Sequence, residues 1–368
     1  MCIKIKKNKL FFYISFFLLY ISGFLGDIGS DVIDFSQVAK YFRMASYAVM
    51  VLQFININRK KKEYKKFLVI ILISILLYFT SKDLYFCIMA LMIMNSLDCI
   101  PEQIIKESLC IMLSGIISVL VLCAIRALPD VMTSRTGVGQ FDRHSFGFVH
   151  SDVLPVIILY SEIYYIILKN KKVKNIELLI FLGIQSILYI FCDSRNGFYM
   201  GILLVVLVLF EKNIGINKFI KRVITFFSQY EVLILGALSY TMIYLLESGG
   251  IWDKIDSLFS GRFRGAIFKA RVIGINIISK ITYDEFMADD RVLDNGYLYI
   301  MLRYGILILA VFIFINYFYV KRYKENFYAI IAIFVVLLAN FVDNDLTDYS
   351  FLPFIILVFN RHKLGESP

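Results

Sequence analysis

Apolar runs of about the length of a membrane helix follow one another along almost the whole chain, separated by short polar segments. Hydrophobic residues make up 59% of the 368 residues and charged residues 18%. A soluble domain cannot bury so large an apolar fraction. The sequence therefore predicts an all-α, polytopic protein of the cell membrane, folded as a single membrane domain over residues 1–368 and surrounded by the lipid bilayer.

Lysine-rich clusters predict how these runs are oriented. Clusters at 4–9, 59–66, 169–174 and 212–222 mark the cytoplasmic side, where the flanks of membrane spans gather cations. They require two spans within 67–96, a run that would reach roughly 45 Å as one helix, beyond a hydrocarbon core of about 30 Å. The formal charge of +10 follows from this orientation and predicts no nucleic-acid partner. We predict about twelve spans with both termini cytoplasmic: 10–26, 41–57, two in 67–96, 107–128, 153–168, 176–191, 198–210, 231–246, 296–317, 327–341 and 351–359.

Two polar segments, 129–152 and 247–295, lie outside in this topology, the second between spans nine and ten. The cations differ between the two sides: the cytoplasmic side has 20 Lys and 4 Arg, whereas the external side has 5 Lys and 10 Arg. A guanidinium binds phosphate or carboxylate through two parallel hydrogen bonds, which an ammonium cannot do. The external surface therefore predicts a site for an anionic group.

The segment 141–152, FDRHSFGFVHSD, places Arg143, His144, His150 and Asp152 at the start of a predicted span. Cationic and titratable side chains at a span boundary indicate that a polar or charged ligand is handled there. Arg303, about two turns into the tenth span, is either functional or paired with an acidic neighbour. The other external candidates are Arg195 in SRNG, Arg262 and Arg264 in SGRFRG, and Arg291, Asp294 and Asn295 just before the tenth span.

Metal and cofactor chemistry is not expected. The six cysteines have no CxxC spacing and are interpreted as small core residues. The acidic segments 289–290 and 343–345 resemble metal-binding patterns, but acidic external turns are usually solvated, and several arginines can supply the positive charge that a metal would bring. We therefore predict an activity that needs no metal.

Four short motifs resemble those of the Wzy-type polysaccharide polymerases of Gram-positive bacteria, in the O-antigen ligase and polymerase superfamily. The chain has RHSFGFVH at 143–150, SRNG at 194–197, SGR at 260–262 and DNGYL at 294–298, in the family's order and on the expected side. The resemblance covers roughly residues 110 to 345. The chain departs from the family after His150, where Ser151 and Asp152 replace the usual Pro-Asn, which puts the local loop geometry in doubt.

The resemblance implies a glycosyltransferase with a glycosyltransferase-C-like membrane fold that acts in capsule or O-antigen biosynthesis. It would transfer a growing glycan from undecaprenyl diphosphate to the next lipid-linked repeat unit at the outer face, without metal and with inversion. A flippase and a chain-length regulator are possible partners. Residue by residue, it implies that Arg143, Arg195 and Arg262 neutralise the departing diphosphate, with Arg264 and Arg291 in reserve; that His150 or His144 is the base, with Asp152 or Asp294 as alternatives; and that Asp294 and Asn295 bind substrate.

Two other functions stay open on sequence. A ligase of the same superfamily would transfer a finished chain to a different acceptor. A flippase or other transporter could also have about twelve spans, but the sequence shows no clear repeat of its halves and no charge cluster in the middle of the spans.

Overall fold

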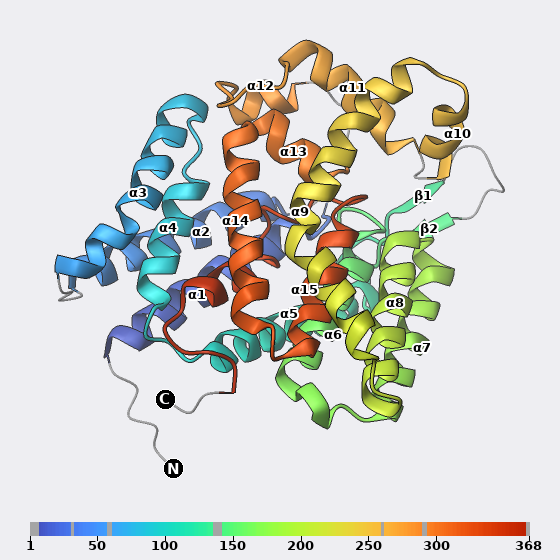
Figure 1. The fold of residues 1–368 in the computed structure, drawn as a ribbon, viewed down its shortest axis with the longest axis horizontal. Helices are drawn as coiled ribbons and strands as arrows, with labels where there is room; N and C mark the ends of the chain where they lie inside the picture. Colours follow the sequence, from blue (N-terminus) through green and yellow to red (C-terminus); the bar gives the residue numbers. More distant parts are fainter. Residues whose placement is uncertain are drawn as a thin grey trace.

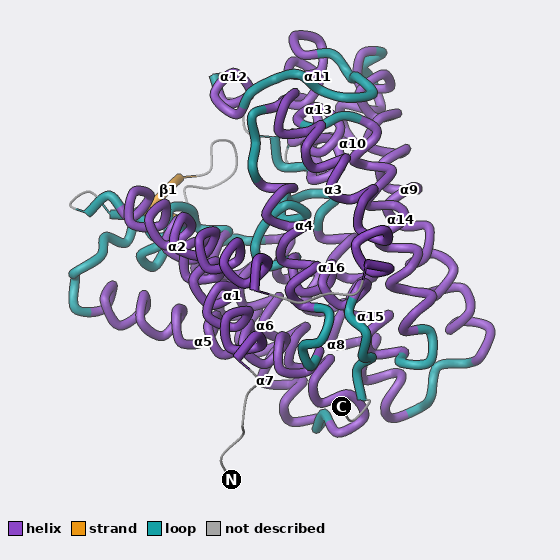
Figure 2. The backbone as a smooth tube through the Cα atoms, turned by 90° about the vertical axis from the view of Figure 1, so that its left-hand side faces the viewer, coloured by secondary structure: helices purple, strands orange, loops and turns teal. Residues whose placement is uncertain are grey.

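The computed structural model describes residues 7–30, 33–56, 61–134, 142–258, 261–288 and 293–365. Within these ranges the predicted apolar runs are helices packed into one bundle (Figures 1 and 2). The bundle helices are α1 (Lys7–Gly26), α2 (Phe35–Asn56), α3 (Lys61–Ser81), α4 (Tyr85–Ser96), α5 (Pro101–Ala124), α6 (Val153–Lys169), α7 (Asn175–Cys192), α8 (Arg195–Asn213), α9 (Lys218–Glu247), α13 (Gly296–Arg303), α14 (Ile306–Tyr323), α15 (Phe327–Ala339) and α16 (Leu352–Phe359).

Seven helices in the described part of the chain are long and apolar enough to cross a membrane: α1, α5, α6, α7, α8, α9 and α14. Shorter apolar helices cover 70–81 in α3, all of α4 and all of α15. The predicted class, a helical membrane protein, is confirmed. The number of twelve spans and the cytoplasmic placement of the termini stay predictions.

Two helix breaks decide how the spans are divided. The run 67–96 consists of two helices, as predicted, and the chain reverses at Lys82, whose φ is 55°. The predicted single span 296–317 is wrong, because α13 ends at Arg303 and α14 begins at Ile306. Between them Gly305 has a φ of 99°, and a Cβ on it would lie 2.5 Å from the carbonyl oxygen of Ile277. Only glycine adopts that conformation at so close a backbone approach.

The break also explains Arg303, which is fully buried at the end of α13 instead of lying inside a long span. Its guanidinium donates to the carbonyl of Ile281 and lies 3.4 Å from Asp83. Asp83 also accepts a hydrogen bond from the Tyr304 hydroxyl at 2.9 Å. Of the two alternatives for Arg303, a functional role or pairing with an acidic neighbour, the structure shows the pairing.

The long segment 247–295 is folded in its described part. It forms α10 (Ile251–Leu258), α11 (Arg262–Ile273) and α12 (Tyr283–Met287), which cover one end of the bundle above α9 and α13 (Figures 1 and 2). We call this the capped end. The segment 129–152 contains a short antiparallel hairpin, β1 (Met132–Ser134) and β2 (Asp142–His144), in which Thr133 is opposite Arg143. Apart from a 3-10 turn at Asn170–Lys172 and an isolated bridge between Ile28 and Phe148, the other described elements are α-helices, as predicted.

The chain after α16 lies at the opposite end of the bundle (Figure 1). There the Asn360 side chain donates to the carbonyls of Ser96 and Cys99 at 2.9 and 3.0 Å. Between the two ends, α15 is buried at 11 of its 13 residues and contacts α6, α8, α9 and α14. Because almost every α15 side chain is apolar, the helix packs on all sides. Residues 340–350, which follow it, lie at the capped end.

We expect the capped end to face the outside. A cysteine placed at Ser257, on α10, should react with a membrane-impermeant thiol reagent in intact cells, and one at Lys172 should not, each in a background without the native cysteines. The expectation rests on the lysine clusters, which include Lys172. Labelling at Lys172 with none at Ser257 would reverse the topology.

Candidate functional site

A cavity of about 350 Å³ opens at the capped end, where segments far apart in the sequence converge. Four residues predicted from sequence line it: His150, Asp152, Arg262 and Asp294. His150, Arg262 and Asp294 belong to three of the four motifs, and Asp152 follows the first motif. The fourth motif reaches the same place through Asn196, whose side chain donates to the carboxylate of Asp343, another lining residue.

Arg262 is at the centre of the charge network. It begins α11 directly after Gly261, whose φ of 75° turns the chain into the helix. Its guanidinium lies 2.7 Å from Asp343, 3.5 Å from Asp294 and 4.0 Å from Asp152. The side chain is 18% exposed, so the pairing is largely shielded from water. A single cation therefore compensates carboxylates from three separate segments.

Arg143 contacts the same network from the other side. Its Nη2 lies 2.7 Å from Asp152, and its Nε donates to the Cys192 carbonyl at 2.9 Å. Asp152 thus accepts from Arg143 through one oxygen and faces Arg262 with the other. Asp152, one of the two residues at which the chain differs from the motif pattern, therefore lies between two of the predicted arginines and contacts both.

His144 is held away from the cavity by Asp130. Its Nδ1 lies 2.6 Å from that carboxylate, which also accepts from the backbone amides of Ser145 and Phe146 at 2.9 and 2.8 Å. Partial burial acts to raise the pKa of Asp130, but the hydrogen bonds, that of His144 first, outweigh burial and lower it. His144 therefore organises the turn that carries Arg143 and does not line the cavity.

His150 is exposed at the cavity, and its imidazole has no hydrogen-bond partner within the described ranges. The structure thus separates the two histidines of one motif, which are six residues apart. Of the two, only His150 has a free imidazole at the cavity. Its proximity to Asp294 also opposes the rise that burial causes in the pKa of that residue.

Asp294 and Asn295 are neighbours with different roles. The Asn295 side chain accepts from the Leu298 amide at 2.8 Å, which caps α13, and donates to Ser239 and to the Phe341 carbonyl at 3.0 and 2.7 Å. It is buried, so its polar atoms serve the fold. Asp294 extends into the cavity, where burial raises its pKa against the opposing charge of Arg262.

The acidic residues of 343–348 were missed as site residues. We expected the 343–345 turn to be solvated, but Asp343, Asp345 and Asp348 are half-buried and line the cavity, together with Asp27. Burial raises the pKa of Asp343 to about 7, of Asp348 to about 6 and of Asp27 to about 8. Three aspartates directly after a fully apolar helix were the available signal. Nothing in the sequence indicated Asp27 as their neighbour.

Three predicted arginines are not part of this cavity or cannot be placed. Arg195 is 47% exposed and lies 4.0 Å from Asp193, and its neighbour Asn196 makes the contact with the site. Arg264 is 66% exposed and is paired with Asp253 at 2.6 Å. Arg291 lies outside the described residues.

The cavity is thus an acidic site with two arginines at its edge, at one end of a helical membrane protein. Among the described residues, no group of three His, Cys, Asp or Glu side chains is arranged to hold a metal ion. No protein-family model, curated protein or solved structure matches this chain.

The raised pKa values predict how stability depends on pH. An unfolded aspartate has a pKa near 3.8, so between that value and about 8 the folded protein binds more protons than the unfolded chain. The stabilisation is complete below the unfolded pKa and is lost as pH rises through the folded values. We expect the melting temperature of the purified protein to fall from about pH 5 to about pH 8. Asp27→Asn should flatten this slope, and Asp98→Asn, at the opposite end of the bundle, should not.

Proposed function

We propose that this chain is a membrane glycosyltransferase that polymerises lipid-linked repeat units, moving a growing glycan from undecaprenyl diphosphate to the next unit. The observation that carries the proposal is the cavity at the capped end. It combines residues of three motifs on which the family resemblance rests, although the first motif is more than a hundred residues from the other two. The active site would face outward from the cell membrane.

The reaction is a displacement at the anomeric carbon of the donor glycan. A hydroxyl oxygen of the acceptor forms the new bond as the carbon–oxygen bond to the diphosphate breaks, and the electron pair leaves with the phosphate oxygen. The hydroxyl proton passes to His150, with Asp294 as the alternative acceptor. Attack opposite the leaving group inverts the anomeric configuration.

A cavity rich in carboxyl groups suits the glycan part of the substrate. Sugar hydroxyls donate to carboxylates and accept from protonated carboxyls, and raised pKa values keep both forms present near neutral pH. Backbone segments 150–153 and 343–350 form much of this lining. The same carboxylates disfavour a diphosphate unless part of their charge is removed.

Arg262 can bind the departing diphosphate if one of its carboxylate partners becomes neutral. Asp343 is the nearest partner, and its pKa of about 7 means that modest added negative charge nearby would protonate it. Arg262 would then turn two of its donors to the phosphate oxygens. Arg143 would hold Asp152 in place. No metal is required in this scheme.

The ligase and transporter alternatives are separated from polymerase by one experiment. Surface polysaccharide from a deletion strain is sized on a gel: loss of a polymerase leaves single repeat units at the surface, loss of a ligase leaves none attached, and loss of a flippase stops delivery of any unit. Restoration of long chains by the plasmid-borne gene is the control. Normal chain length in the deletion strain would overturn the proposal.

The transporter alternative has one structural observation in its favour. Two membrane helices each bury a carboxyl group, Glu162 in α6 and Glu231 in α9. Glu162 accepts from Gln185 at 3.2 Å, and both oxygens of Glu231 lack a hydrogen-bond partner in the described part of the chain. Buried membrane carboxyls often belong to transport pathways. Neither residue lines the cavity at the capped end, which is why we rank this function second.

A further inference from the structure

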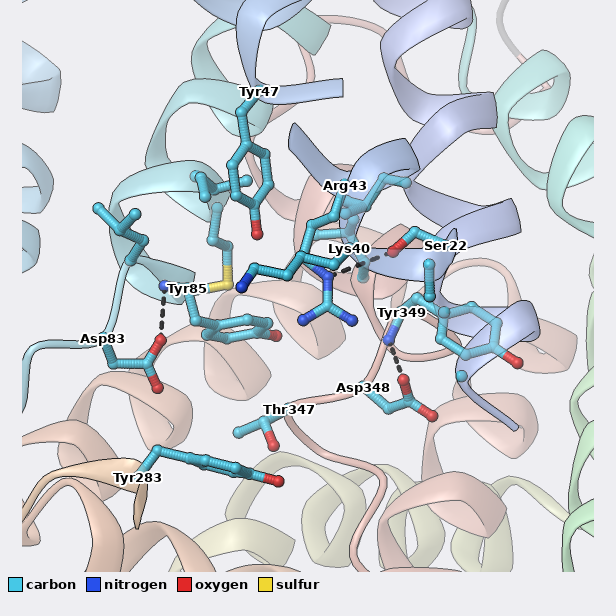
Figure 3. Close-up of a pocket in the computed structure, with 18 of the residues that line it drawn as sticks. Ser22, Lys40, Arg43, Tyr47, Asp83, Tyr85, Tyr283, Thr347, Asp348 and Tyr349 are labelled. Carbon is cyan, nitrogen blue, oxygen red and sulfur yellow. Dashed lines mark hydrogen bonds between the residues drawn. The ribbon is translucent and has the colours of Figure 1, made fainter. Parts of the chain in front are cut away.

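A second and larger cavity, about 910 Å³, lies beside the first and contains none of the predicted site residues. It is formed by α1, α2 and α4, by tyrosines of α12 and α13, and by the segment 347–349 (Figure 3). Asp348 and Tyr349 line both cavities, so they form a shared wall. The Tyr349 hydroxyl is held by Asp27 at 2.8 Å.

The second cavity differs from the first in charge. Lys40, Arg43 and Lys82 line it, and none of them forms an ion pair with a carboxylate within the described ranges. The acidic lining residues are Asp83 and Asp348. Asp83 already contacts Arg303 and Tyr304. The three cations therefore share the cavity with one other carboxyl group, that of Asp348.

Arg43 points into this space with its terminal nitrogens available. Among the described residues, the guanidinium has a hydrogen bond only from its Nε, to Ser22 at 3.2 Å, and Figure 3 shows it between Tyr85 and Tyr349. Tyr85 gives a second, independent indication of a ligand. Its hydroxyl is buried without any hydrogen-bond partner in the described structure and lies on the same side as the guanidinium (Figure 3). An unpaired buried hydroxyl is destabilising, and a bound acceptor would remove that cost.

The remaining lining is apolar. Met44 and Leu84 line the cavity and are also 58% and 48% exposed, so its opening has an apolar rim. Met89 and Met92 form apolar wall farther along α4. Free arginine and lysine donors beside tyrosines and an apolar rim match an anionic head group that carries a hydrocarbon chain.

We propose that this second cavity binds the phosphate head of a prenyl-type lipid, with Arg43 and Lys40 as its cationic ligands and Tyr85 as a hydroxyl donor. The identity of the lipid rests on the proposed function. A polymerase uses two lipid-linked substrates, a donor that loses its diphosphate and an acceptor that keeps it. This cavity would hold the phosphate of the acceptor lipid. The glycan of that lipid would then extend past Tyr349 towards His150.

The test measures binding of radiolabelled farnesyl diphosphate to the full-length protein in nanodiscs. Arg43→Gln should weaken binding about tenfold or more, because a charge-assisted bidentate contact is lost, and Lys40→Gln should weaken it by a smaller factor. Tyr85→Phe should lower affinity severalfold while raising the melting temperature, a pair of effects that a purely structural hydroxyl would not give. Arg271→Gln, an exposed arginine paired with Glu247, is the matched control and should bind normally.

Competitors identify the ligand chemistry. Unlabelled farnesyl diphosphate should compete well, and farnesol and inorganic pyrophosphate poorly. Equal competition by farnesol would overturn the anion site, and equal competition by pyrophosphate would replace the lipid with free phosphate. Wild-type binding by both Arg43→Gln and Lys40→Gln would overturn the proposal. Failure of the polymerase function would instead appear as normal surface polysaccharide in the deletion strain, with the Arg43-dependent binding unaffected.

Discussion

Replacing Arg262 with lysine is expected to reduce polymerisation on the order of a hundredfold, the cost of losing one preorganised donor of roughly 3 kcal/mol. Lysine keeps the positive charge but has one compact ammonium in place of a planar fork. It cannot face Asp343, Asp294 and Asp152 together and also present two parallel donors to a phosphate. The measurement is the rate at which membranes containing the variant extend lipid-linked repeat units, followed by gel.

Arg271→Lys is the matched control, since Arg271 also lies on α11 but is 65% exposed and, within the described residues, is paired with Glu247 alone. It should retain wild-type activity. The melting temperature of Arg262→Lys tells an unfolded variant from an inactive one. Wild-type rates from a folded Arg262→Lys protein would remove the arginine from the mechanism.

His150→Gln is expected to lower the rate by about a hundredfold to ten-thousandfold, the usual contribution of a positioned general base. Glutamine approximates the size of the imidazole and can still accept a hydrogen bond, but it cannot take up the proton. His144→Gln should cost less, because His144 acts through Asp130 on the hairpin and does not line the cavity. The same extension assay measures both.

His362 supplies the control for this pair. It follows α16 at the opposite end of the bundle, where its carbonyl accepts from Arg322, so His362→Gln should leave the rate unchanged. A normal rate from His150→Gln together with a severe loss from Asp294→Asn would move the base to Asp294. Equal effects at His144 and His150 would contradict the separation of the two histidines.

Much of the architecture was predictable because lipid imposes strong rules. Every backbone polar group inside a bilayer must be paired within the chain, so each long apolar run had to be a helix. The length limit also predicted the division of 67–96 at Lys82, which the structure confirms. The break at Gly305 was missed because apolar residues continue on both sides of it, and only the packing against 277–278 shows that the glycine is a turn.

The candidate site was predictable in part. Arg262, Asp294, Asp152 and His150 were named from sequence and share one cavity, whereas Arg195, Arg264 and His144 do not line it. Sequence position could not separate these groups, because each lies in a polar segment with similar neighbours. What separates them is whether the local turn directs the side chain towards the cavity or towards solvent, and that depends on contacts between distant segments.

The sequence by itself determined that this is a helical membrane protein, because its apolar content and the spacing of its polar segments leave no soluble alternative. The tertiary structure alone decided the charge of the two cavities. Around Arg262 it places Asp343, Asp294 and Asp152, which turns a predicted cationic site into a largely acidic one. Around Arg43 it places no carboxylate within ion-pair distance in the described part of the chain, so the unpaired positive charge lies in the neighbouring cavity. Electrostatic interactions fall off over a few ångströms, so charge balance depends on which distant residues become neighbours, and folding alone sets that.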